Sequence, residues 1–226
     1  DNVMRKKNHY LYNVKEIHSP MNYFGMGGLL RYYMYSDVFE LDTVCKEILQ
    51  EYPTETILTL MNSTSTHDMS RPTELLGCNA FDYYGQYPWN IKGWDEMSDE
   101  QRMEWLRNHQ MTEEEYEHGK LVEKSYVTAL AFLPGIFTIY YGDEVGMQGI
   151  GNLLNRGTYP WGREDKDMLV FYKKLIASRK SEEFLKKADI KIKKINHEQF
   201  VFERYTESEK LLVIVSRANV QTYIDI

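Results

Sequence analysis

The sequence predicts an α/β region at residues 1–185 followed by an all-β region at residues 186–226. Two apolar runs, 57–62 and 136–141, have the composition of short buried strands, and helical patterns lie between them. From Asp189 the apolar residues recur at every second position, which is typical of strands with one buried face. Strands that alternate with helices indicate a parallel sheet, whereas consecutive strands indicate an antiparallel one.

Composition argues against several kinds of partner. The formal net charge of the 226 residues is −7, which disfavours a nucleic acid held through phosphate contacts. No segment approaches ~18 consecutive apolar residues, so no membrane span is expected. Cys45 and Cys78 are too few for a disulfide scaffold and lack the spacing of metal ligands. They are expected to be buried small hydrophobes or, alternatively, one disulfide pair.

Aromatic residues are unusually frequent, at 14%, with 18 Tyr and 4 Trp. Tyrosine and tryptophan combine a flat apolar face with a polar tip. Such side chains suit sugar rings, which have an apolar face and a rim of hydroxyls. An aromatic-rich core is the alternative, and composition does not separate the two.

The first part of the chain is expected to start with a polar, basic loop or frayed helix at 1–15 and a short strand at 16–23. A glycine-rich turn then leads into an apolar helix at 29–35. Apolar residues spaced three and four apart predict a second, amphipathic helix before Pro53. These residues are Leu41, Val44, Cys45, Ile48 and Leu49.

Segment 77–118 interrupts the alternation of strands and helices. Its first part is rich in aromatic residues, and its second part holds helix starts at Ser98 and Thr112, whose hydroxyls can cap a helix. An excursion of this length is usually functional or disordered, and the aromatic content argues against disorder. The aromatic residues are Phe81, Tyr83, Tyr84, Tyr87, Trp89 and Trp94.

The second half of the chain resumes the alternation. A helix at 120–133 stops at Pro134-Gly135, and the strand at 136–141 follows. A Gly- and Asn-rich loop at 146–161 precedes a helix at 165–180. The period of two then predicts four strands in the all-β region. Their ranges are 189–195, 199–205, 210–216 and 220–225.

A candidate site follows the strand at 57–62. The next loop carries His67, Asp68 and Arg71 within a few positions. Ligands collect at the carboxyl ends of parallel strands, because the loops converge there above a rigid sheet. An imidazole, a carboxylate and a guanidinium at such a place suit a hydroxyl-rich substrate. The alternative is a local hydrogen-bonded turn, since Asp readily bonds backbone N–H groups nearby.

Three stretches carry a more specific pattern. They are Met21-Asn22-Tyr23, His67-Asp68 with Arg71, and the run from Leu133 to Met147 that contains Tyr140-Tyr141-Gly142-Asp143-Glu144. Asn155-Arg156 through Pro160-Trp161, and the helix at 171–176 with Arg179, continue the pattern. Together they resemble consecutive landmarks of the α-amylase family of glycoside hydrolases over residues 18–180. Neopullulanase and cyclomaltodextrinase-type members are the most similar.

The resemblance implies the C-terminal portion of a (β/α)₈ TIM barrel followed by the start of a β-sandwich. Residues 16–23, 57–62 and 136–141 would be barrel strands six to eight, and segment 77–118 would be an insertion on the catalytic face. The first five strands would lie outside the chain. Because three strands cannot close a barrel, self-association or pairing with the missing half-barrel is expected.

Retaining glycosidases need a nucleophile and a general acid/base ~5 Å apart. In the resembled family these lie on the fourth and fifth strands, and a third carboxylate on the seventh strand holds the distorted sugar. Asp68 matches this transition-state stabiliser, and His67 matches the histidine that bonds the same ring. Asp143 and Glu144 fall in the eighth-strand loop, outside the catalytic pair. No residue matches the nucleophile or the acid/base, so the chain is expected to be inactive alone.

The same resemblance suggests further contacts with the substrate. Arg71, Asn155 and Arg156 are expected to bind it, and Trp89 and Trp94 to stack on sugar rings from the catalytic face. The alternative for the two tryptophans is that they pack a small loop subdomain, since aromatic side chains mostly bury themselves.

The function expected is that of a fragment of a retaining α-glucan hydrolase or transglycosylase, with an α-glucan oligosaccharide of the starch, maltodextrin or cyclodextrin class as partner. A non-catalytic amylase-like scaffold for sugar binding or protein assembly is the alternative. No organic cofactor is expected; calcium occurs in many family members, but no ligand can be assigned in this chain. The two cysteines and the resemblance to intracellular maltodextrin-degrading members favour a cytoplasmic location.

Overall fold

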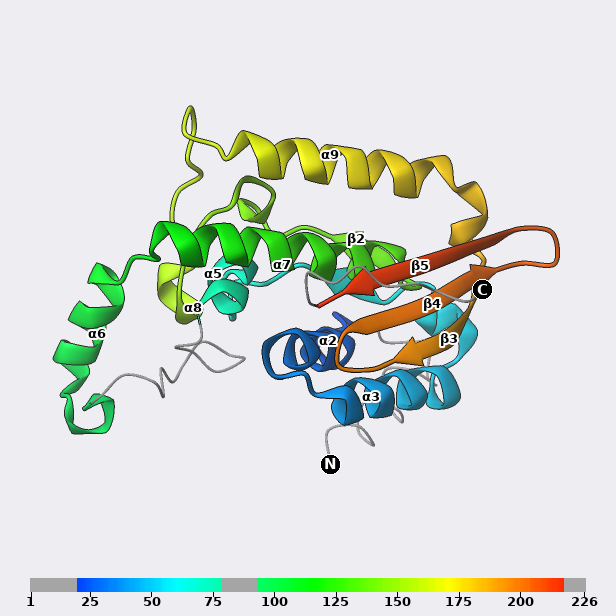
Figure 1. Cartoon of the computed structure of the whole chain (residues 1–226), viewed down its shortest axis with the longest axis horizontal. Helices are drawn as coiled ribbons and strands as arrows, with labels where there is room; N and C mark the ends of the chain where they lie inside the picture. Colours follow the sequence, from blue (N-terminus) through cyan, green and yellow to red (C-terminus); the bar gives the residue numbers. More distant parts are fainter. Residues whose placement is uncertain (1–19, 79–92, 218–226) are drawn as a thin grey trace. The chain divides into compact units, whose positions relative to one another are not determined.

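The computed structural model describes residues 20–78 and 93–217 of the chain (Figure 1). The chain separates into two compact units. The first comprises Asp1–Asn62, Ser125–Phe137 and Ser178–Ile226, and the second comprises Ser63–Lys124 and Thr138–Ala177. Within the described ranges, no helix is both long and apolar enough to span a membrane. The domain boundary expected near residue 185 remains a prediction.

Two capped helices open the first unit, and both were expected. α2 (Tyr23–Tyr35) begins after Asn22, whose side-chain oxygen accepts a hydrogen bond from a first-turn amide. It ends at Ser36, which has a left-handed φ of 60°. α3 (Val38–Glu51) begins after Asp37, whose carboxylate also accepts a first-turn amide. Because Asn22 satisfies the exposed amides of the first turn, α2 starts earlier than its apolar run indicates.

The strand expected at 57–62 is shorter than the sequence suggests. α4 (Thr54–Ile57) occupies its beginning, and β1 covers only Met61–Ser63. The Thr59 hydroxyl donates back to two carbonyls of the preceding turn, at 3.0 and 3.1 Å. Such local bonds give the backbone an alternative to a strand ladder, which explains the late start of β1.

β1 pairs with β2 (Ile136–Thr138), the strand expected at 136–141. The Ile136 amide donates to the Leu60 carbonyl at 2.7 Å, and the Thr64 amide donates to the Thr138 carbonyl at 2.9 Å. Both segments therefore advance in the same direction, so the pairing is parallel.

The strand expected at 16–23 is described only from residue 20 onward. Within that part, Met21 forms an isolated parallel bridge with Met61 of β1. These parallel pairings agree in direction with a barrel, but the assignment of the segments to numbered barrel strands remains a prediction.

The all-β segment of the first unit is an antiparallel sheet, as its period of two predicts (Figure 1). Its strands are β3 (Asp189–Ile195), β4 (Gln199–Tyr205) and β5 (Lys210–Ser216), with β4 in the centre. These bounds confirm the three expected strands. The central strand carries the most buried side chains. The fourth expected strand, 220–225, lies outside the described residues.

α7 (Glu113–Phe132) unites two segments that the sequence suggested as separate helices. Its N-terminal cap forms as expected, since the Thr112 hydroxyl accepts the Glu115 amide and the Glu115 carboxylate accepts the Thr112 amide. Gly119 lies inside this helix, and a Cβ there would collide with the Thr73 carbonyl. The glycine therefore permits two backbones of the second unit to approach closely.

The remaining elements of the second unit are mostly short. They are α5 (Pro72–Gly77), η2 (Trp94–Glu96), α6 (Asp99–Asn108), η3 (Asp143–Val145) and α8 (Gly151–Leu154). The expected start at Ser98 is confirmed by a full capping box with Gln101. The expected helix at 165–180 is confirmed as α9 (Lys166–Ser181), which continues into the first unit, where η4 (Glu183–Lys186) follows.

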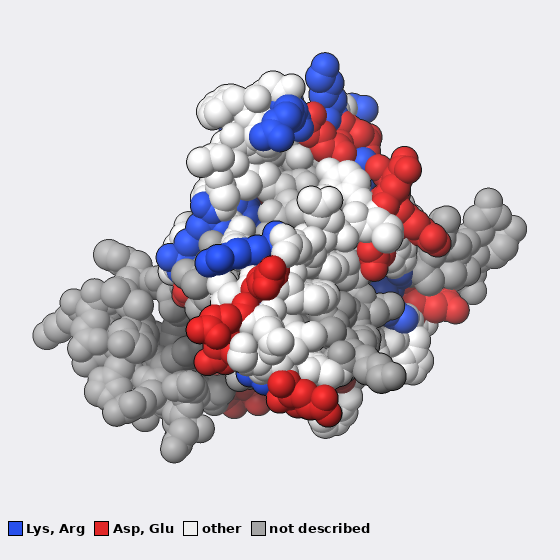
Figure 2. All heavy atoms as spheres, turned by 90° about the vertical axis from the view of Figure 1, so that its left-hand side faces the viewer, with Lys and Arg blue, Asp and Glu red and all other residues white. Residues whose placement is uncertain are grey.

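Charged side chains of both signs lie on the surface. On the face that Figure 2 displays, acidic and basic side chains are interspersed with uncharged ones.

Arg204, on β4, is fully buried and ties together the C-terminal part of the first unit. Its guanidinium donates to the backbone carbonyls of Phe132 (2.8 Å), Leu185 (2.9 Å), Ala188 (2.8 Å) and Asp189 (3.2 Å). Arg179 donates to two further carbonyls, in segment 131–135. Two guanidinium groups thus lie at the C-terminal end of α7, where the helix dipole favours positive charge.

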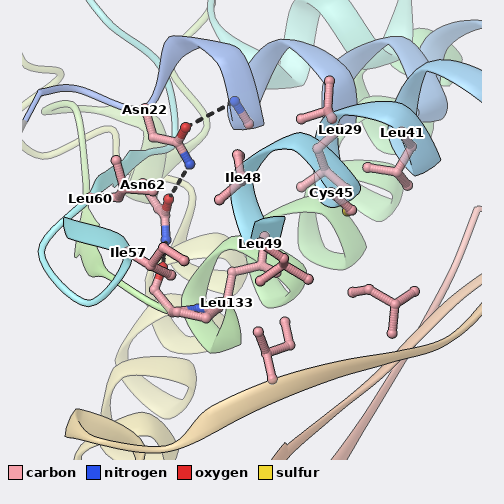
Figure 3. A pocket seen from close by; sticks show the side chains of 15 residues that line it. Asn22, Leu29, Leu41, Cys45, Ile48, Leu49, Ile57, Leu60, Asn62 and Leu133 are labelled. Carbon is pink, nitrogen blue, oxygen red and sulfur yellow. Dashed lines mark hydrogen bonds between the residues drawn. The ribbon is translucent and has the colours of Figure 1, made fainter. Parts of the chain in front are cut away.

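Apolar side chains of the first unit converge on a cavity of about 40 Å³ (Figure 3). At its border the Asn22 amide donates to the Asn62 oxygen at 2.9 Å, and the Asn62 amide donates to the Pro134 carbonyl at 2.8 Å. Cys45 lines the cavity. Both Cys45 and Cys78 are free thiols whose pKa burial raises to about 12, so the alternative of a disulfide pair is wrong.

Arg204→Met removes the donors of four backbone carbonyls, of which those of Leu185 and Ala188 are buried and the other two are partly buried. We expect it to lower the free energy of unfolding by about 3–5 kcal/mol, because the carbonyls would lose their hydrogen-bond partners inside the protein. The matched control is Lys191→Met, an exposed position on the neighbouring β3, with an expected change within ~0.5 kcal/mol. Urea denaturation measures both; equal stability of the two variants would contradict the role of Arg204.

Candidate functional site

Loop 63–71, which follows β1, buries most of its side chains but presents two to solvent. His67 and Asp68 are exposed, whereas the residues on both sides of this pair are buried. In a loop that only reverses the chain direction, we would expect more of the neighbouring side chains to be exposed as well. The buried flanks therefore act as a frame that holds these two neighbouring side chains outward.

Three of the predicted site residues meet at this loop. The His67 Nε2 lies 3.2 Å from one carboxylate oxygen of Asp68, and the Arg156 guanidinium lies 3.5 Å from the other. Arg156 also donates from Nε to the His67 carbonyl at 3.2 Å. All three side chains are about half exposed, so these contacts add little stability and stay accessible to a ligand.

Arg71, expected to bind substrate, is instead fully buried, with 0% of its side chain exposed. Its Nη1 donates to an oxygen of Asp143 at 2.7 Å and to the Tyr141 carbonyl at 2.5 Å. Its Nε and Nη2 donate to the Asn155 carbonyl at 3.0 and 2.8 Å. With its donors occupied by the protein, the guanidinium holds the end of loop 63–71 and does not reach the surface.

Asp143 joins the start of the same loop to its end. One oxygen accepts the hydroxyls of Thr64 and Ser65, both at 2.6 Å, and the other accepts Arg71. Burial raises the pKa of the Asp143 carboxyl, while Arg71 and the two hydroxyls lower it. The sequence placed Asp143 outside the catalytic pair but gave no sign of this partnership, which spans 72 positions of the chain.

Asn155, also expected to bind substrate, is likewise fully buried. Its side-chain amide donates to the carbonyls of Thr66 (3.0 Å) and Met69, on either side of the exposed pair. Its own side-chain oxygen has no hydrogen-bond partner among the described residues. Asn155 therefore supports the loop from within, and its neighbour Arg156 is the member of this pair that reaches the surface.

A second buried carboxyl, which the sequence analysis did not single out, lies on α7. Glu123 accepts hydroxyl hydrogen bonds from Thr73 and from Tyr172, the latter at 2.8 Å. Burial raises its pKa to about 8, with a further contribution from the charge of Asp143. Glu74 is similar, because burial raises its pKa to about 7 although it accepts the Gly149 amide. Glutamates and hydroxyl residues are common along the chain, so the sequence did not indicate that Glu123 and Glu74 are buried.

Of the two tryptophans expected to stack on sugar, only Trp94 is among the described residues. Trp89 lies outside the described residues. Trp94 is only 7% exposed and meets Trp105 edge to face at 5.8 Å, with Arg102 over its ring. Because its faces are occupied by neighbouring side chains, Trp94 packs a small subdomain, which was the alternative interpretation.

The exposed cluster of His67, Asp68 and Arg156 combines acceptors and donors in one place. A carboxylate and a guanidinium side by side match the paired hydroxyls of a sugar. Loop 63–71 contains one carboxylate, whereas retaining glycoside hydrolysis needs two, ~5 Å apart. In the described part of the chain, no group of three or more His, Cys, Asp or Glu side chains is arranged to hold a metal ion.

Comparison with known proteins gives relatives in one class of enzyme, although no family model matches the sequence. The chain is 29% identical to an amylopullulanase of Thermoanaerobacter thermohydrosulfuricus over 168 residues, 74% of this chain and 10% of the relative. It is 35% identical to a cyclomaltodextrinase of Thermoanaerobacter pseudethanolicus over 92 residues, 40% of this chain and 16% of the relative. The chain is homologous to α-amylase-family glycoside hydrolases.

The resemblance inferred from the sequence motifs is thereby confirmed. A solved structure of the Nostoc punctiforme debranching enzyme, soaked with acarbose, has the same fold over 93% of this chain and 39% of its own. Its TM-score is 0.65 at 19% identity. The described elements of this chain thus share their fold with part of this enzyme, which is consistent with a C-terminal part. The chain spans only 10% and 16% of the length of the two curated relatives.

Asp143→Asn leaves the buried Arg71 without its counter-charge. We expect the free energy of unfolding to fall by about 3–5 kcal/mol, the usual cost of removing one member of a buried ion pair. Glu144→Gln, one position on and half-buried, keeps an acceptor oxygen for the Gly142 amide and is expected to change stability by less than ~0.5 kcal/mol. Chemical denaturation compares the two variants. A similar small effect of both would show that the pair does not hold the loop.

Glu123 predicts a dependence of stability on pH. In the folded state its pKa is about 8, above the ordinary value of 4.5, so between these values the folded state keeps a proton that the unfolded state has released. The free energy of unfolding is therefore highest below the ordinary value and falls, by on the order of a few kcal/mol, as pH rises to about 8.

Thermal or urea unfolding from pH 5 to 9 measures this slope. Glu123→Gln, which cannot ionise, is expected to flatten it, leaving the smaller slope from Glu74. Glu114→Gln, an exposed position on the same helix, is the control and should keep the slope of the original protein. Identical slopes in the two variants would mean that Glu123 is ionised throughout.

Proposed function

We propose that this chain is part of a retaining α-glucan glycoside hydrolase or transglycosylase that acts on oligosaccharides of the starch, maltodextrin or cyclodextrin class. The observation that carries the proposal is the exposed Asp68, held between His67 and Arg156 at the carboxyl end of β1. Homology to an amylopullulanase and a cyclomaltodextrinase supports an α-glucan as the ligand of this exposed cluster.

In this proposal Asp68 stabilises the transition state. Its carboxylate accepts hydroxyl hydrogen bonds that strengthen as the sugar ring flattens and gains oxocarbenium character. His67 donates to the same ring, and Arg156 orients the carboxylate and adds a donor at the edge of the site. Arg71 and Asn155 act through the backbone, because they hold loop 63–71 from inside the protein.

The nucleophile and the acid/base are proposed to come from residues other than these 226. Loop 63–71 has one carboxylate, and Asp143, the nearest other acidic residue tied to the loop, is buried against Arg71. A carboxylate that is already neutralised and enclosed is a poor nucleophile for a sugar. The 226 residues alone are therefore expected to bind α-glucan without cleaving it.

The strand assignment belongs to the same proposal. The segment at residue 21, β1 and β2 would be the sixth, seventh and eighth strands of a barrel, and β3 to β5 would open a C-terminal sandwich. Their parallel pairings support this order. Because these strands leave an open sheet, we propose that the rest of the barrel, or a second copy, covers their free edges.

The test is Asp68→Asn in the complete gene product. We expect kcat on a maltooligosaccharide to fall ~10²–10³-fold, the usual effect of removing one interaction made to the transition state. KM should change little, and the melting temperature should stay the same because Asp68 is exposed. The matched control is Asp99→Asn, whose side chain is fully exposed on α6.

Three results would contradict the proposal. Unchanged kcat in the Asp68→Asn variant would remove Asp68 from the chemistry. A complete gene product that binds α-glucan but cleaves none would leave the non-catalytic scaffold as the better account. Cleavage by the 226 residues alone would contradict the proposal that the catalytic pair lies elsewhere.

A further inference from the structure

Loop 156–164 of the second unit exposes a large aromatic side chain. Trp161 is 82% exposed, and its ring centroid lies 4.5 Å from that of Tyr159, with the two planes inclined at 49°. Most tryptophans in folded proteins bury the greater part of their surface. A tryptophan this open, with a second aromatic ring beside it, is the kind of feature that marks a binding surface.

The backbone of this loop is well bonded, so the ring is presented from a defined turn. The Trp161 amide donates to the Tyr159 carbonyl at 2.9 Å, and the Arg163 amide donates to the Pro160 carbonyl at 2.8 Å. Gly162 has a φ of 77°, which a larger residue rarely adopts, and its amide donates to the Glu164 carboxylate at 3.0 Å. The turn therefore fixes the position from which the Trp161 side chain leaves the surface.

The loop is continuous with the exposed cluster at Asp68. Arg156, at its beginning, contacts both His67 and Asp68. The Tyr141 hydroxyl donates to the Gly157 carbonyl at 2.9 Å, which anchors the next position. Trp161 follows five positions after Arg156, so the backbones of these two residues lie at most ~18 Å apart. One oligosaccharide chain can span that distance.

The surroundings of the aromatic pair fit a sugar better than an apolar protein face. Burial and the nearby charge of Glu144 raise the pKa of Tyr159, and the exposed Arg156 and Arg163 lie on the same loop. A ring face that stacks on a pyranose, next to carboxylate and guanidinium groups that bond its hydroxyls, is complementary to carbohydrate. An apolar protein surface would instead remove water from these charges without replacing their hydrogen bonds.

We propose that Tyr159 and Trp161 form a second carbohydrate contact, which holds an α-glucan chain by stacking at a distance from the ring bound by Asp68. This inference rests on the proposed function and names a further position at which its substrate is recognised. It gives the exposed Trp161 the stacking role that was expected of Trp94, whereas the expectation for Trp89 stays a prediction.

The experiment is calorimetric titration of the complete gene product in an Asp68→Asn background, which slows turnover, with maltoheptaose and with maltose. Trp161→Ala is expected to weaken binding of maltoheptaose about tenfold and to leave maltose nearly unchanged, because only the longer chain reaches both contacts. Trp161→Phe should restore most of the lost affinity. The control is Phe39→Ala, which removes an 80% exposed aromatic ring from the first unit and should change neither affinity.

Each alternative outcome overturns the inference. Unchanged affinity of Trp161→Ala for maltoheptaose would contradict the second carbohydrate contact. The proposed function would still stand in that case if Asp68→Asn alone lowers kcat. A lower melting temperature with unchanged affinity would show that Trp161 packs against polypeptide. If neither sugar binds the protein before Trp161 is changed, the proposed function fails together with this inference.

Discussion

The buried ion pair between Arg71 and Asp143 is the interaction on which the candidate site depends. Two charges taken out of water cost several kcal/mol each unless every donor and acceptor finds a partner. Here the carboxylate accepts two hydroxyls from the start of loop 63–71, and the guanidinium donates to two backbone carbonyls besides. The Asp143 carboxylate thus holds both ends of loop 63–71, and His67 and Asp68 lie at the exposed tip of this loop.

The first unit also contains a buried arginine, but this one has a different structural role. Within residues 20–78 and 93–217, the buried Arg204 forms no ion pair with a carboxylate, and backbone carbonyls at the ends of several elements share its charge. Arginine suits both places, because its planar fork stays charged and directs several donors at fixed angles. In the second unit the buried Arg71 positions a loop that reaches the surface. In the first unit the buried Arg204 joins a sheet to the end of a helix.

The elements that could be predicted from sequence are those with a local cause. The three strands from Asp189 to Ser216 have the bounds that the period of two predicts, although the central β4 is buried on both faces. The helix starts at Ser98 and Thr112 follow from capping chemistry. The prediction of a strand at 57–62 was wrong for its first residues, because the Thr59 hydroxyl donates a hydrogen bond back to the preceding turn.

The side chains of the site were harder to predict than its place. The loop after β1 was identified, and His67, Asp68 and Arg156 do meet there. Arg71 and Asn155 were given sugar contacts because a one-dimensional pattern does not reveal burial, and their partners lie more than 70 positions away. The exposed Trp161 was noted as part of a motif, but only its surroundings in three dimensions indicate a surface role.

The measurement that tests this account most directly is a crystal structure of the complete gene product with a bound maltooligosaccharide. The account predicts one glucosyl ring at loop 63–71, with its hydroxyls within hydrogen-bond distance of the Asp68 carboxylate and the His67 imidazole. It also predicts that Arg71 stays on Asp143, without contact to the sugar. An oligosaccharide bound only elsewhere, with Asp68 facing solvent, would contradict it.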